Sequence, residues 1–356
     1  MTKLHLASGE SFNGKSFGAD TESVGEVVFT TGMTGYLETL TDPSYYGQIV
    51  VFTFPLIGNY GVFDPKQIAP GVDETYESQQ IWVKGVVLTE WSEEFSHCQA
   101  FQDFAAWLKK NNIPALTDVD TRALTQTLRE HGCIMGSLSE SPAPDYTDHL
   151  KGRYVPEVSP SEVTVLEPTK GDIGKTVAFV DCGAKNGIFR NFLERGVKVI
   201  RFPFDANPYE SGHDFDGIFF SNGPGDPDTV TETIETMKIA LTDDKPIFGI
   251  CLGNQMLGLA AGGKTEKMKY GHRGVNQPVE DVETKKCIVT TQNHGYVVAE
   301  DGLPADFKVW FKNLNDGSVE GIKHKTKPVF AAQFHPEACA GPEDAAYLFD
   351  KFIAEL

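Results

Sequence analysis

The chain has 356 residues, of which 40% are hydrophobic and 23% charged, and its net charge is −19 at pH 7. Single hydrophobic cores stop growing at roughly 250–300 residues, so we expect two domains. The acidic excess argues against nucleic acid or an anionic membrane as a partner. The composition is that of an ordinary globular protein, which excludes the disordered and fibrous classes.

The start of the chain and its cysteines favour a cytoplasmic location. The first residues, MTKLHLASGESFNGKSFG, contain no apolar segment of signal-peptide length, and no stretch approaches 18 consecutive apolar residues. The six cysteines are scattered without a CxxC pair. That pattern predicts reduced thiols and argues against a structural zinc site, so we expect no metal on this chain.

Residues 1–140 have the pattern of a strand-rich α+β domain. From Gly25 to Phe63, short β-branched and aromatic runs alternate with Gly, Pro and Asp turns, which is typical of strands. Two helical patterns close this part. One spans Ser96 to Lys110 with a single apolar stripe of Phe101, Phe104, Ala105 and Leu108, and the other spans Asp120 to His131 with Gly132 as its stop.

Residues 141–174 are predicted to be an interdomain linker. The stretch from Ser139 to Gly174 is rich in Pro, Ser, Asp and Glu and has little periodicity. Such a composition is typical of a linker with some local structure.

Residues 175–356 alternate apolar strand patterns with helical patterns. In chain order we expect strands at 176–182, 197–204, 215–220 and 245–251, and helices at 184–196, 230–241 and 253–263. Such alternation predicts right-handed βαβ units and a mostly parallel α/β sheet. Ligands of these sheets bind at the carboxyl ends of the strands, so the residues just after each strand carry the functional information.

Cys251 lies at such a strand end, in the sequence Gly249-Ile250-Cys251-Leu252-Gly253. Glycines two before and two after a nucleophile relieve crowding in a sharp strand-to-helix turn. The N-terminus of the following helix also favours a thiolate. A buried structural cysteine is the alternative interpretation of this pattern.

A cysteine nucleophile needs a base that a third group orients, and KPVFAAQFHPEA supplies both. His335 follows a predicted strand from Val329 to Phe334, and Glu337 lies two residues further on. Residues i and i+2 share a face in extended chain, so the carboxylate can hold the imidazole. Alone, His-Pro-Glu could be only a polar turn; together with the cysteine turn it indicates a catalytic site.

Two further glycine turns have different interpretations. SNGPGDP, residues 221–227, exposes backbone N–H groups near the sheet, which with the N–H of Leu252 could stabilise an oxyanion; an ordinary surface turn is the alternative. Gly258 to Thr265 matches a phosphate-loop pattern, but it forms the end of the helix after Cys251 rather than a strand-to-helix loop. We therefore expect no ATP binding there.

With these residues assembled, the C-terminal half resembles the class I glutamine amidotransferases. The segments that carry the resemblance are SNGPGDP, FGICLGNQ, GHRGVNQPV, TTQNHGYVV, SVEGIKH and QFHPEA. The N-terminal half resembles the extra domain of one family within this class, the glutamine-hydrolysing small subunits of carbamoyl-phosphate synthase. It does so through GEVVFTTGMTGYLETLTDPSYYGQIV, FPLIGNYG and DVDTRALTQTLREHG.

The resemblance implies a set of site residues. The nucleophile falls on Cys251, the catalytic histidine on His335 and its carboxylate on Glu337. The implied glutamine-binding residues are Ser44, Gly223, Gly225, Leu252, Gln255, Asn293, Gly295 and Tyr296. Because Ser44 comes from the N-terminal domain, we expect the pocket to lie partly at the domain interface. The chain departs from the family's frequent histidines at Asn254 and Gln277.

The resemblance also implies that the overall reaction is divided between two chains. Ammonia from glutamine would pass to the large carbamoyl-phosphate synthase subunit, which would use ATP, bicarbonate and Mg²⁺ for carbamoyl phosphate synthesis in the arginine and pyrimidine pathways. No cofactor is implied on this chain. Two alternatives stay open: another cysteine-triad hydrolase of this fold, such as a γ-glutamyl peptidase, and a catalytically silent scaffold that regulates a synthetase.

Overall fold

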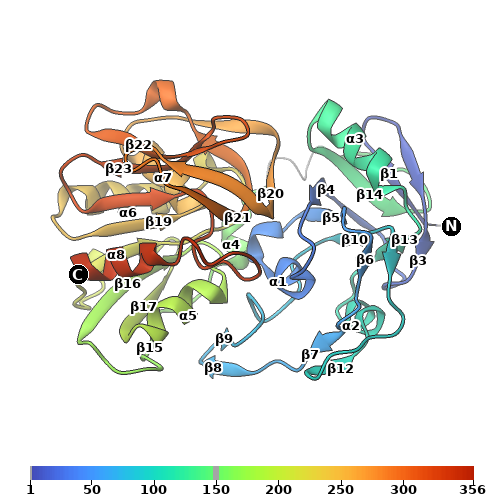
Figure 1. The fold of residues 1–356 in the computed structure, drawn as a ribbon, viewed down its shortest axis with the longest axis horizontal. Coiled ribbons are helices and arrows are strands. Elements are labelled where there is room, and N and C mark those ends of the chain that lie inside the picture. The colour runs from blue at the N-terminus through green and yellow to red at the C-terminus, as the bar shows by residue number, and fades with distance from the viewer. Residues whose placement is uncertain (1, 147–151) are drawn as a thin grey trace.

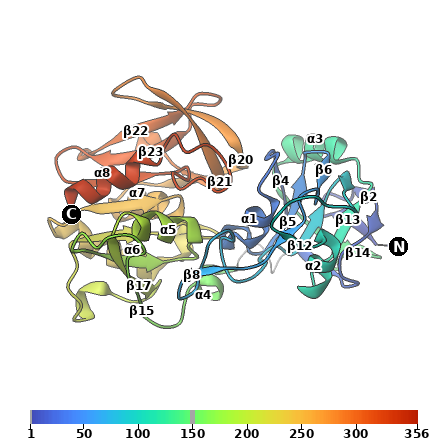
Figure 2. The same ribbon diagram turned by 60° about the horizontal axis from the view of Figure 1, so that its bottom comes forward.

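The computed structural model describes residues 2–146 and 152–356. Figure 1 shows two lobes side by side, the N-terminal one in blue and teal and the C-terminal one in green to red. The two termini lie at the far ends of their lobes in each view (Figures 1 and 2). Helix α1 (Tyr36–Thr41) lies where the lobes meet.

An eight-stranded sheet forms the core of the N-terminal lobe. Its strands, in spatial order, are β2 (Ser11–Asn13), β1 (Lys3–Leu6), β14 (Ile134–Ser139), β4 (Ser23–Thr30), β5 (Gln48–Phe52), β10 (Gly85–Val87), β13 (Ala115–Thr117) and β3 (Lys15–Ser16). The run from β4 to β13 is parallel and the outer pairs are antiparallel. Three small two-stranded pairs extend the lobe: β6 (Leu56–Ile57) with β11 (Glu90–Trp91), β7 (Val62–Phe63) with β12 (Ala100–Gln102), and β8 (Gln67–Ala69) with β9 (Val72–Asp73).

Apolar residues cover both faces of this sheet. Successive strand residues point to opposite faces, so neighbours such as Val27 and Val28 belong to different apolar clusters. One cluster includes residues of α3 (Thr121–His131), and the other includes α1 and α2 (Phe104–Lys110). The short 3₁₀ turn Pro43–Tyr45 follows α1 directly and carries Ser44.

One of the two helices predicted in this lobe is confirmed and the other is partly wrong. Helix α3 spans Thr121–His131 and ends at Gly132, whose φ is +93°. The pattern from Ser96 to Lys110 is helical only from Phe104, because the Asp103 side chain caps the helix by accepting from the Ala106 N–H at 2.7 Å. Phe101 lies in β12 and is 50% exposed, so it is not part of the apolar stripe.

A ten-stranded mixed sheet forms the C-terminal lobe. Its order is β15 (Thr164–Leu166), β17 (Val197–Pro203), β16 (Lys175–Asp181), β18 (Gly217–Phe220), β19 (Ile247–Ile250), β24 (Val329–Ala332), β23 (Val319–His324), β22 (Phe307–Asn313), β20 (Thr265–Asp281) and β21 (Cys287–Val298). The five strands from β17 to β24 are parallel. Beyond β24 the sheet continues antiparallel.

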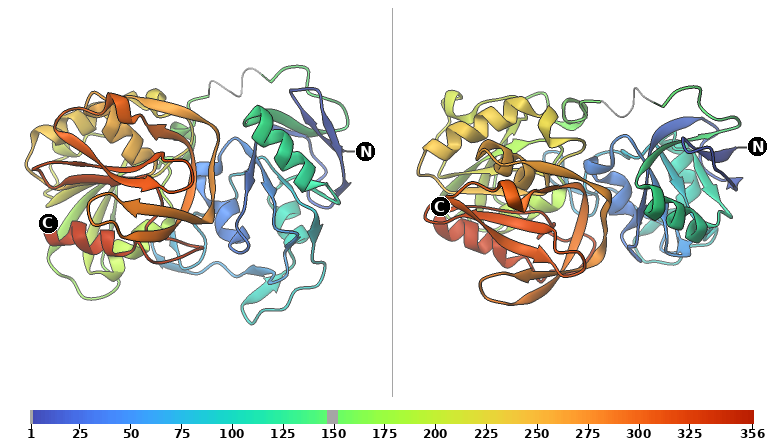
Figure 3. Two further views of the ribbon diagram at one scale, coloured as in Figure 1. Left: turned by 45° about the horizontal axis from the view of Figure 1, so that its top comes forward. Right: turned by 90° about the horizontal axis from the view of Figure 1, so that it is seen from above.

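Helices cover both faces of the parallel strands (Figure 3). Helices α5 (Asn186–Glu194) and α8 (Tyr347–Glu355) pack on one face, while α6 (Thr231–Thr242) and α7 (Leu252–Ala260) pack on the other. Short 3₁₀ turns occupy Pro208–Glu210, Pro227–Thr229 and Glu300–Gly302. The predicted fold class, a strand-rich α+β domain followed by an α/β domain, is confirmed. Within the described residues, no helix combines the length and apolar character that crossing a membrane requires.

Part of the segment predicted as a linker packs on the C-terminal lobe. Strand β15 pairs antiparallel with β17 at the edge of the ten-stranded sheet. The short helix α4 (Val155–Val158) buries Val155 in the apolar cluster beneath α6 and α7. Residues 147–151 of the predicted linker lie outside the described residues.

Candidate active site

Cys251 occupies a strained turn between strand β19 and helix α7. Its φ is +55° and its ψ is −100°, a conformation that non-glycine residues seldom adopt. The turn is held in place because the Cys251 N–H donates to the Ala332 carbonyl on the neighbouring strand at 2.8 Å. Strain of this kind at a cysteine is typical of a functional residue.

The glycines on either side of Cys251 leave no room for a side chain. A Cβ on Gly249 would lie 2.8 Å from the Gly253 carbonyl carbon. A Cβ on Gly253 would lie 2.4 Å from the Phe220 carbonyl oxygen. Backbone atoms cannot give way cheaply, so the sharp turn that presents the thiol requires glycine at both positions.

Replacing Gly253 by Ala is expected to lower the unfolding free energy by about 1–3 kcal/mol, the usual cost of overpacking a core. The added methyl group would push the start of α7 away from the Phe220 carbonyl. Gly302→Ala is the matched control, because its nearest neighbour would be a Lys264 side-chain atom at 3.6 Å. Urea denaturation measures the unfolding free energy of both variants, and equal values would contradict the packing argument.

His335 and Glu337 form a buried pair next to Cys251. The His335 Nδ1 and Glu337 Oε1 atoms are 2.6 Å apart, and both side chains are at most 1% exposed. The other ring nitrogen, Nε2, makes no hydrogen bond within ordinary distance limits to the described residues. The Cys251 thiol donates to the Asn293 carbonyl at 3.5 Å. The carboxylate therefore holds one nitrogen of the ring and leaves the other free of a protein partner among the described residues.

The electrostatics of this pair favour the charged forms of both groups. Burial lowers the pKa of His335, but the charge of the Glu337 carboxylate, together with the hydrogen bonds of the ring, raises that pKa to about 10. Burial raises the pKa of Glu337, but the cations of Lys185 and His335 bring it down to about 2. His335 is thus an imidazolium near neutral pH, a proton donor beside the sulfur.

Lys185 is a second buried cation beside the Glu337 carboxylate, and the sequence analysis missed it. Its ammonium lies 3.2 Å from Glu337 Oε1 and donates to the Ala338 carbonyl at 2.9 Å, in a position that is only 3% exposed. The carboxylates of Glu337, Glu77 and Asp42 outweigh burial and hold the pKa of Lys185 above its usual value. A signal was present, because Lys185 closely follows a predicted parallel strand.

Replacing Lys185 by Met is expected to lower the unfolding free energy by about 3–5 kcal/mol, because one partner of a buried ion pair is then left alone. The control is Lys198→Met, which breaks an exposed pair with Glu167 and should cost no more than about 1 kcal/mol. Urea denaturation compares the two variants. A Lys185→Met protein as stable as the control would contradict this account of the pair.

A cavity of about 310 Å³ opens in front of Cys251, between the two lobes. Of the predicted site residues, it is lined by Ser44, Gly223, Gly225, Cys251, Gln255, Asn293, Gly295 and Tyr296. The N-terminal lobe adds lining residues that the sequence analysis did not name, including Glu26, Tyr46 and Gln48. The structure therefore brings these predicted residues together around one opening, with His335 and Glu337 behind it.

Leu252 is the one predicted glutamine-binding residue that does not line this cavity. It is 1% exposed, and its side chain packs in the cluster on the α6 and α7 face. A Cβ on Gly223 would lie 2.8 Å from Leu252 Cδ2, so Gly223 packs against the Leu252 side chain. A contribution of Leu252 to the site would thus come from its backbone N–H, as the sequence analysis expected.

Polar contacts between the lobes fix several of the lining residues. The Asn222 amide donates to Ser44 Oγ at 2.9 Å, and the Asn293 amide donates to Asp42 Oδ2 at 3.0 Å. Asp42 also accepts from the Ser44 N–H at 2.8 Å, which sets the 3₁₀ turn. These buried hydrogen bonds fix the two halves of the cavity relative to each other.

The two departures from the family pattern lie away from this cavity. The Asn254 amide donates to Gln333 Oε1 at 3.1 Å beneath helix α7. Gln277 on β20 accepts from Asn313 and Asn315 at 3.4 and 3.2 Å. Neither side chain lines the cavity in front of Cys251.

The apparent phosphate loop has the position expected from the sequence. Helix α7 ends at Ala260, Gly262 adopts a φ of +96°, and Thr265 begins strand β20. The segment therefore leaves a helix for a strand, whereas a phosphate loop leaves a strand for a helix.

Each of the two lobes matches a known protein family. Residues 178–355 match the family model of class I glutamine amidotransferases, and residues 4–138 match that of the carbamoyl-phosphate synthase small chain, CPSase domain. The carbamoyl phosphate synthase arginine-specific small chain of Aspergillus clavatus is 45% identical over 98% of this chain and 78% of its own length. The multifunctional protein pyr1-3 of Dictyostelium discoideum is 44% identical over 98% of this chain and 17% of its own length. Among solved structures, a glutamine amidotransferase from Thermotoga maritima has a TM-score of 0.39 and 17% identity, over 46% of this chain and 76% of that one.

The cysteine turn and the first family match define the C-terminal lobe as a class I glutamine amidotransferase domain. With the second match, and with relatives at 45% identity over nearly the whole chain, the chain belongs to the carbamoyl-phosphate synthase small-chain family.

Proposed function

We propose that this chain hydrolyses glutamine to glutamate and ammonia and passes the ammonia to a large carbamoyl-phosphate synthase subunit. The observation that carries the proposal is the buried arrangement of Cys251, His335 and Glu337 behind a polar cavity of about 310 Å³. The membership of the small-chain family supports the same function.

In the proposed mechanism the Cys251 thiolate attacks the side-chain carboxamide carbon of glutamine and forms a tetrahedral oxyanion. The N–H groups of Leu252 and Gly223 stabilise that oxyanion. The intermediate collapses to a glutamyl thioester when His335 donates its proton to the departing nitrogen, which leaves as ammonia. Neutral His335 then removes a proton from water, and the hydroxide displaces the sulfur, which gives the side-chain carboxylic acid and restores the thiolate and imidazolium; the acid releases its proton to solvent as glutamate.

The remaining predicted residues are proposed to hold glutamine. Gln255 lies one helical turn after Cys251 and lines the same cavity, so its side chain can bond the polar end of the ligand. Backbone groups of Gly295 and Tyr296 can bind the α-amino and α-carboxylate groups. Ser44, Gly225 and Asn293 complete the binding set from the rim between the lobes.

The fate of the ammonia requires a partner. Free ammonia becomes ammonium in water near neutral pH and loses its nucleophilicity, so it must pass directly to an acceptor site. In this proposal the large subunit supplies that site and binds ATP, Mg²⁺ and bicarbonate, and the N-terminal lobe docks it. The arginine-specific small chains among the relatives favour arginine biosynthesis as the use of the product, with pyrimidine biosynthesis as the second use.

An isotope experiment tests the proposal. The chain and its large subunit receive glutamine labelled with ¹⁵N in the side-chain amide, together with ATP, bicarbonate and excess unlabelled ammonium. We expect ¹⁵N in carbamoyl phosphate, because direct transfer avoids mixing with the bulk ammonium. Release of glutamate with unlabelled product would contradict the transfer, and no release of glutamate would contradict the hydrolysis and favour a silent scaffold. Preference for γ-glutamyl peptides over glutamine would favour the peptidase alternative.

A further inference from the structure

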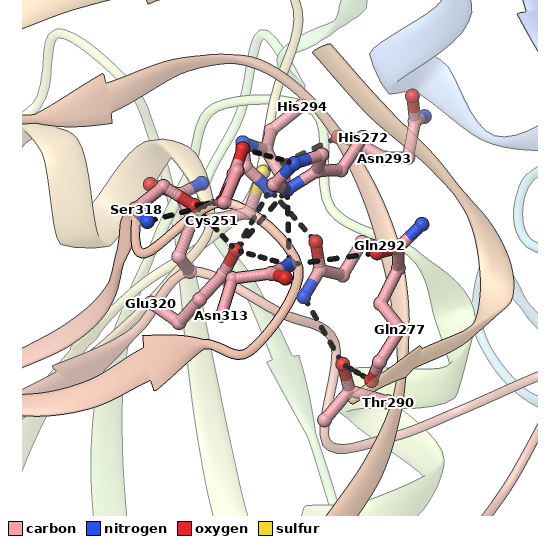
Figure 4. A network of polar contacts seen from close by, with 12 residues as sticks. Cys251, His272, Gln277, Thr290, Gln292, Asn293, His294, Asn313, Ser318 and Glu320 are labelled. Atoms are coloured by element: carbon pink, nitrogen blue, oxygen red, sulfur yellow. Dashed lines mark hydrogen bonds and ion pairs between the residues drawn. The ribbon is translucent and has the colours of Figure 1, made fainter. Parts of the chain in front are cut away.

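A second group of buried polar side chains lies on the antiparallel part of the C-terminal sheet (Figure 4). It contains His272 from β20, His294 from β21 and Glu320 from β23. All three are buried, with exposures of 7%, 4% and 0%. Neither the catalytic nor the glutamine-binding proposal uses these side chains. Two imidazoles and a carboxylate that converge in the interior are a typical donor set for zinc.

The spacing of the three donors fits a tetrahedral zinc ion. One donor atom from each residue lies within 4.8 Å of the other two. His272 Nδ1 is 3.2 Å and His294 Nε2 is 3.7 Å from Glu320 Oε1. Zinc bonds of about 2.0–2.1 Å in tetrahedral geometry separate neighbouring ligand atoms by about 3.3 Å. Small side-chain adjustments would therefore close the group around an ion.

In each histidine the ring nitrogen that faces away from Glu320, which we call the outer nitrogen, has the kind of hydrogen-bond partner that it has in zinc sites. His294 Nδ1 is 3.0 Å from the Tyr296 carbonyl oxygen, and His272 Nε2 is 3.0 Å from Asp316 Oδ2. Metal-bound histidines usually donate their second N–H to a backbone carbonyl or a carboxylate, which turns the remaining lone pair toward the metal. Here the same arrangement turns His294 Nε2 and His272 Nδ1 toward Glu320.

The protein groups alone leave this group incompletely paired. With its Nδ1 proton donated to Tyr296, His294 Nε2 is an acceptor, yet it faces two acceptor oxygens, Gln292 Oε1 at 3.1 Å and Glu320 Oε1 at 3.7 Å. The Gln292 amide nitrogen donates to Thr290 Oγ1 at 3.1 Å, and this hydrogen bond directs the Gln292 amide oxygen toward His294. Glu320 Oε1 accepts from Asn313 Nδ2 at 3.3 Å and from Ser318 Oγ at 3.4 Å, and the same Asn313 nitrogen lies 3.4 Å from His272 Nδ1. Glu320 Oε2, however, is buried without a hydrogen-bond partner among the described residues. A bound cation would satisfy His294 Nε2 and the Glu320 carboxylate together.

We propose that His272 Nδ1, His294 Nε2 and the Glu320 carboxylate bind a divalent zinc ion, with Gln292 Oε1 or water as the fourth ligand. The sequence analysis expected no metal because the cysteines are scattered without a CxxC pair, and it did not consider these three residues, which are far apart in the chain. The ion would join strands β20, β21 and β23. It would also fix β21 where Asn293, Gly295 and Tyr296 line the cavity in front of Cys251.

Metal titration of the purified full-length chain tests the proposal. Exposed Cys98 and Cys287 are first replaced by Ser in every variant, so that surface thiols bind no metal. CoCl₂ is added to the metal-free protein, the visible absorption of tetrahedral Co²⁺ is recorded, and ZnCl₂ is then added as competitor. We expect one equivalent of Co²⁺ per chain and its displacement by one equivalent of Zn²⁺. Absence of a stoichiometric tetrahedral Co²⁺ spectrum would overturn the proposal.

Variants identify the ligands. Glu320→Gln keeps the shape of the side chain but removes its charge, and it should weaken Zn²⁺ binding at least about 100-fold, whereas Asp316→Asn should weaken it about 10–100-fold through the outer nitrogen of His272. His5→Asn is the matched control, because His5 is buried at 6% exposure in the other lobe. Glu320→Gln or Asp316→Asn proteins that bind Zn²⁺ as tightly as the control would overturn the assignment. Asp316 has a side chain that is 44% exposed, so its variant remains a valid test if Glu320→Gln misfolds.

Discussion

Replacing Cys251 by Ser is expected to lower glutamine-dependent carbamoyl phosphate synthesis by at least about 10⁴-fold, the scale of effect that loss of a nucleophile has in hydrolases. A serine hydroxyl stays protonated beside the His335 imidazolium, so the attack on the carboxamide is lost. Synthesis from added ammonium should be unchanged, because that reaction bypasses Cys251. Parallel assays with glutamine and with ammonium chloride, in the presence of the large subunit, measure the two rates.

The control for this substitution is Cys98→Ser, since Cys98 is exposed in the N-terminal lobe. It should retain both activities. If the Cys251→Ser protein kept its use of glutamine, the covalent mechanism would be wrong. If the Cys251→Ser protein also lost synthesis from added ammonium, the substitution would have damaged the complex with the large subunit. The proposal that synthesis from ammonium bypasses Cys251 would then be contradicted.

Replacing Glu337 by Gln is expected to lower kcat/KM for glutamine by roughly 10²–10⁴-fold, as loss of the orienting carboxylate does in related triads. It should also change the pH profile. The carboxylate is the main cause that raises the pKa of His335 to about 10, so the wild-type imidazolium persists until the pH approaches that value. Without the carboxylate the pKa of His335 falls, and the alkaline decline of kcat/KM should begin at lower pH.

The pH dependence of kcat/KM reports groups of the free enzyme, so it is the measurement that checks this shift. Glu283→Gln is the control, because Glu283 pairs with Lys308 and Lys323 on the surface and does not contact His335. An unchanged alkaline limb in Glu337→Gln would mean that another group controls the proton of His335. A rate close to that of the wild type would mean that Glu337 has no orienting role.

The sequence could predict those parts of the molecule that follow simple periodicities. The parallel strands of the C-terminal lobe are short apolar runs bounded by turns, and Cys251 and His335 follow two of them. The need for glycine two residues before and two residues after Cys251 could also be predicted, because a sharp strand-to-helix turn is crowded there. In the structure a Cβ on Gly249 or Gly253 would meet the backbone of Gly253 or Phe220.

Other features depend on contacts that no local pattern records. Strand β20 spans Thr265–Asp281, carries many charges and has register shifts against β21, so neither a period of two nor an apolar run marks it. Lys185 is buried beside carboxylates that are distant in sequence, with Glu337 the nearest one recorded, and no local pattern shows them. The stripe from Ser96 to Lys110 was misinterpreted because the cap at Asp103 makes the helix begin at Phe104, which leaves Phe101 in strand β12.

The hydrogen bonds of Asp42 and Ser44 to Asn293 and Asn222 have a consequence for how the protein can change over evolution. The N-terminal lobe supplies part of the wall of the cavity in front of Cys251, so under the proposed function the lobe boundary is at the same time a substrate surface. A substitution that loosens the contact between the lobes would be removed by selection as a loss of activity, even when each lobe stays folded. The two lobes are therefore constrained to evolve together, and exchange of one lobe with a distant relative would require compensating changes along the whole shared wall.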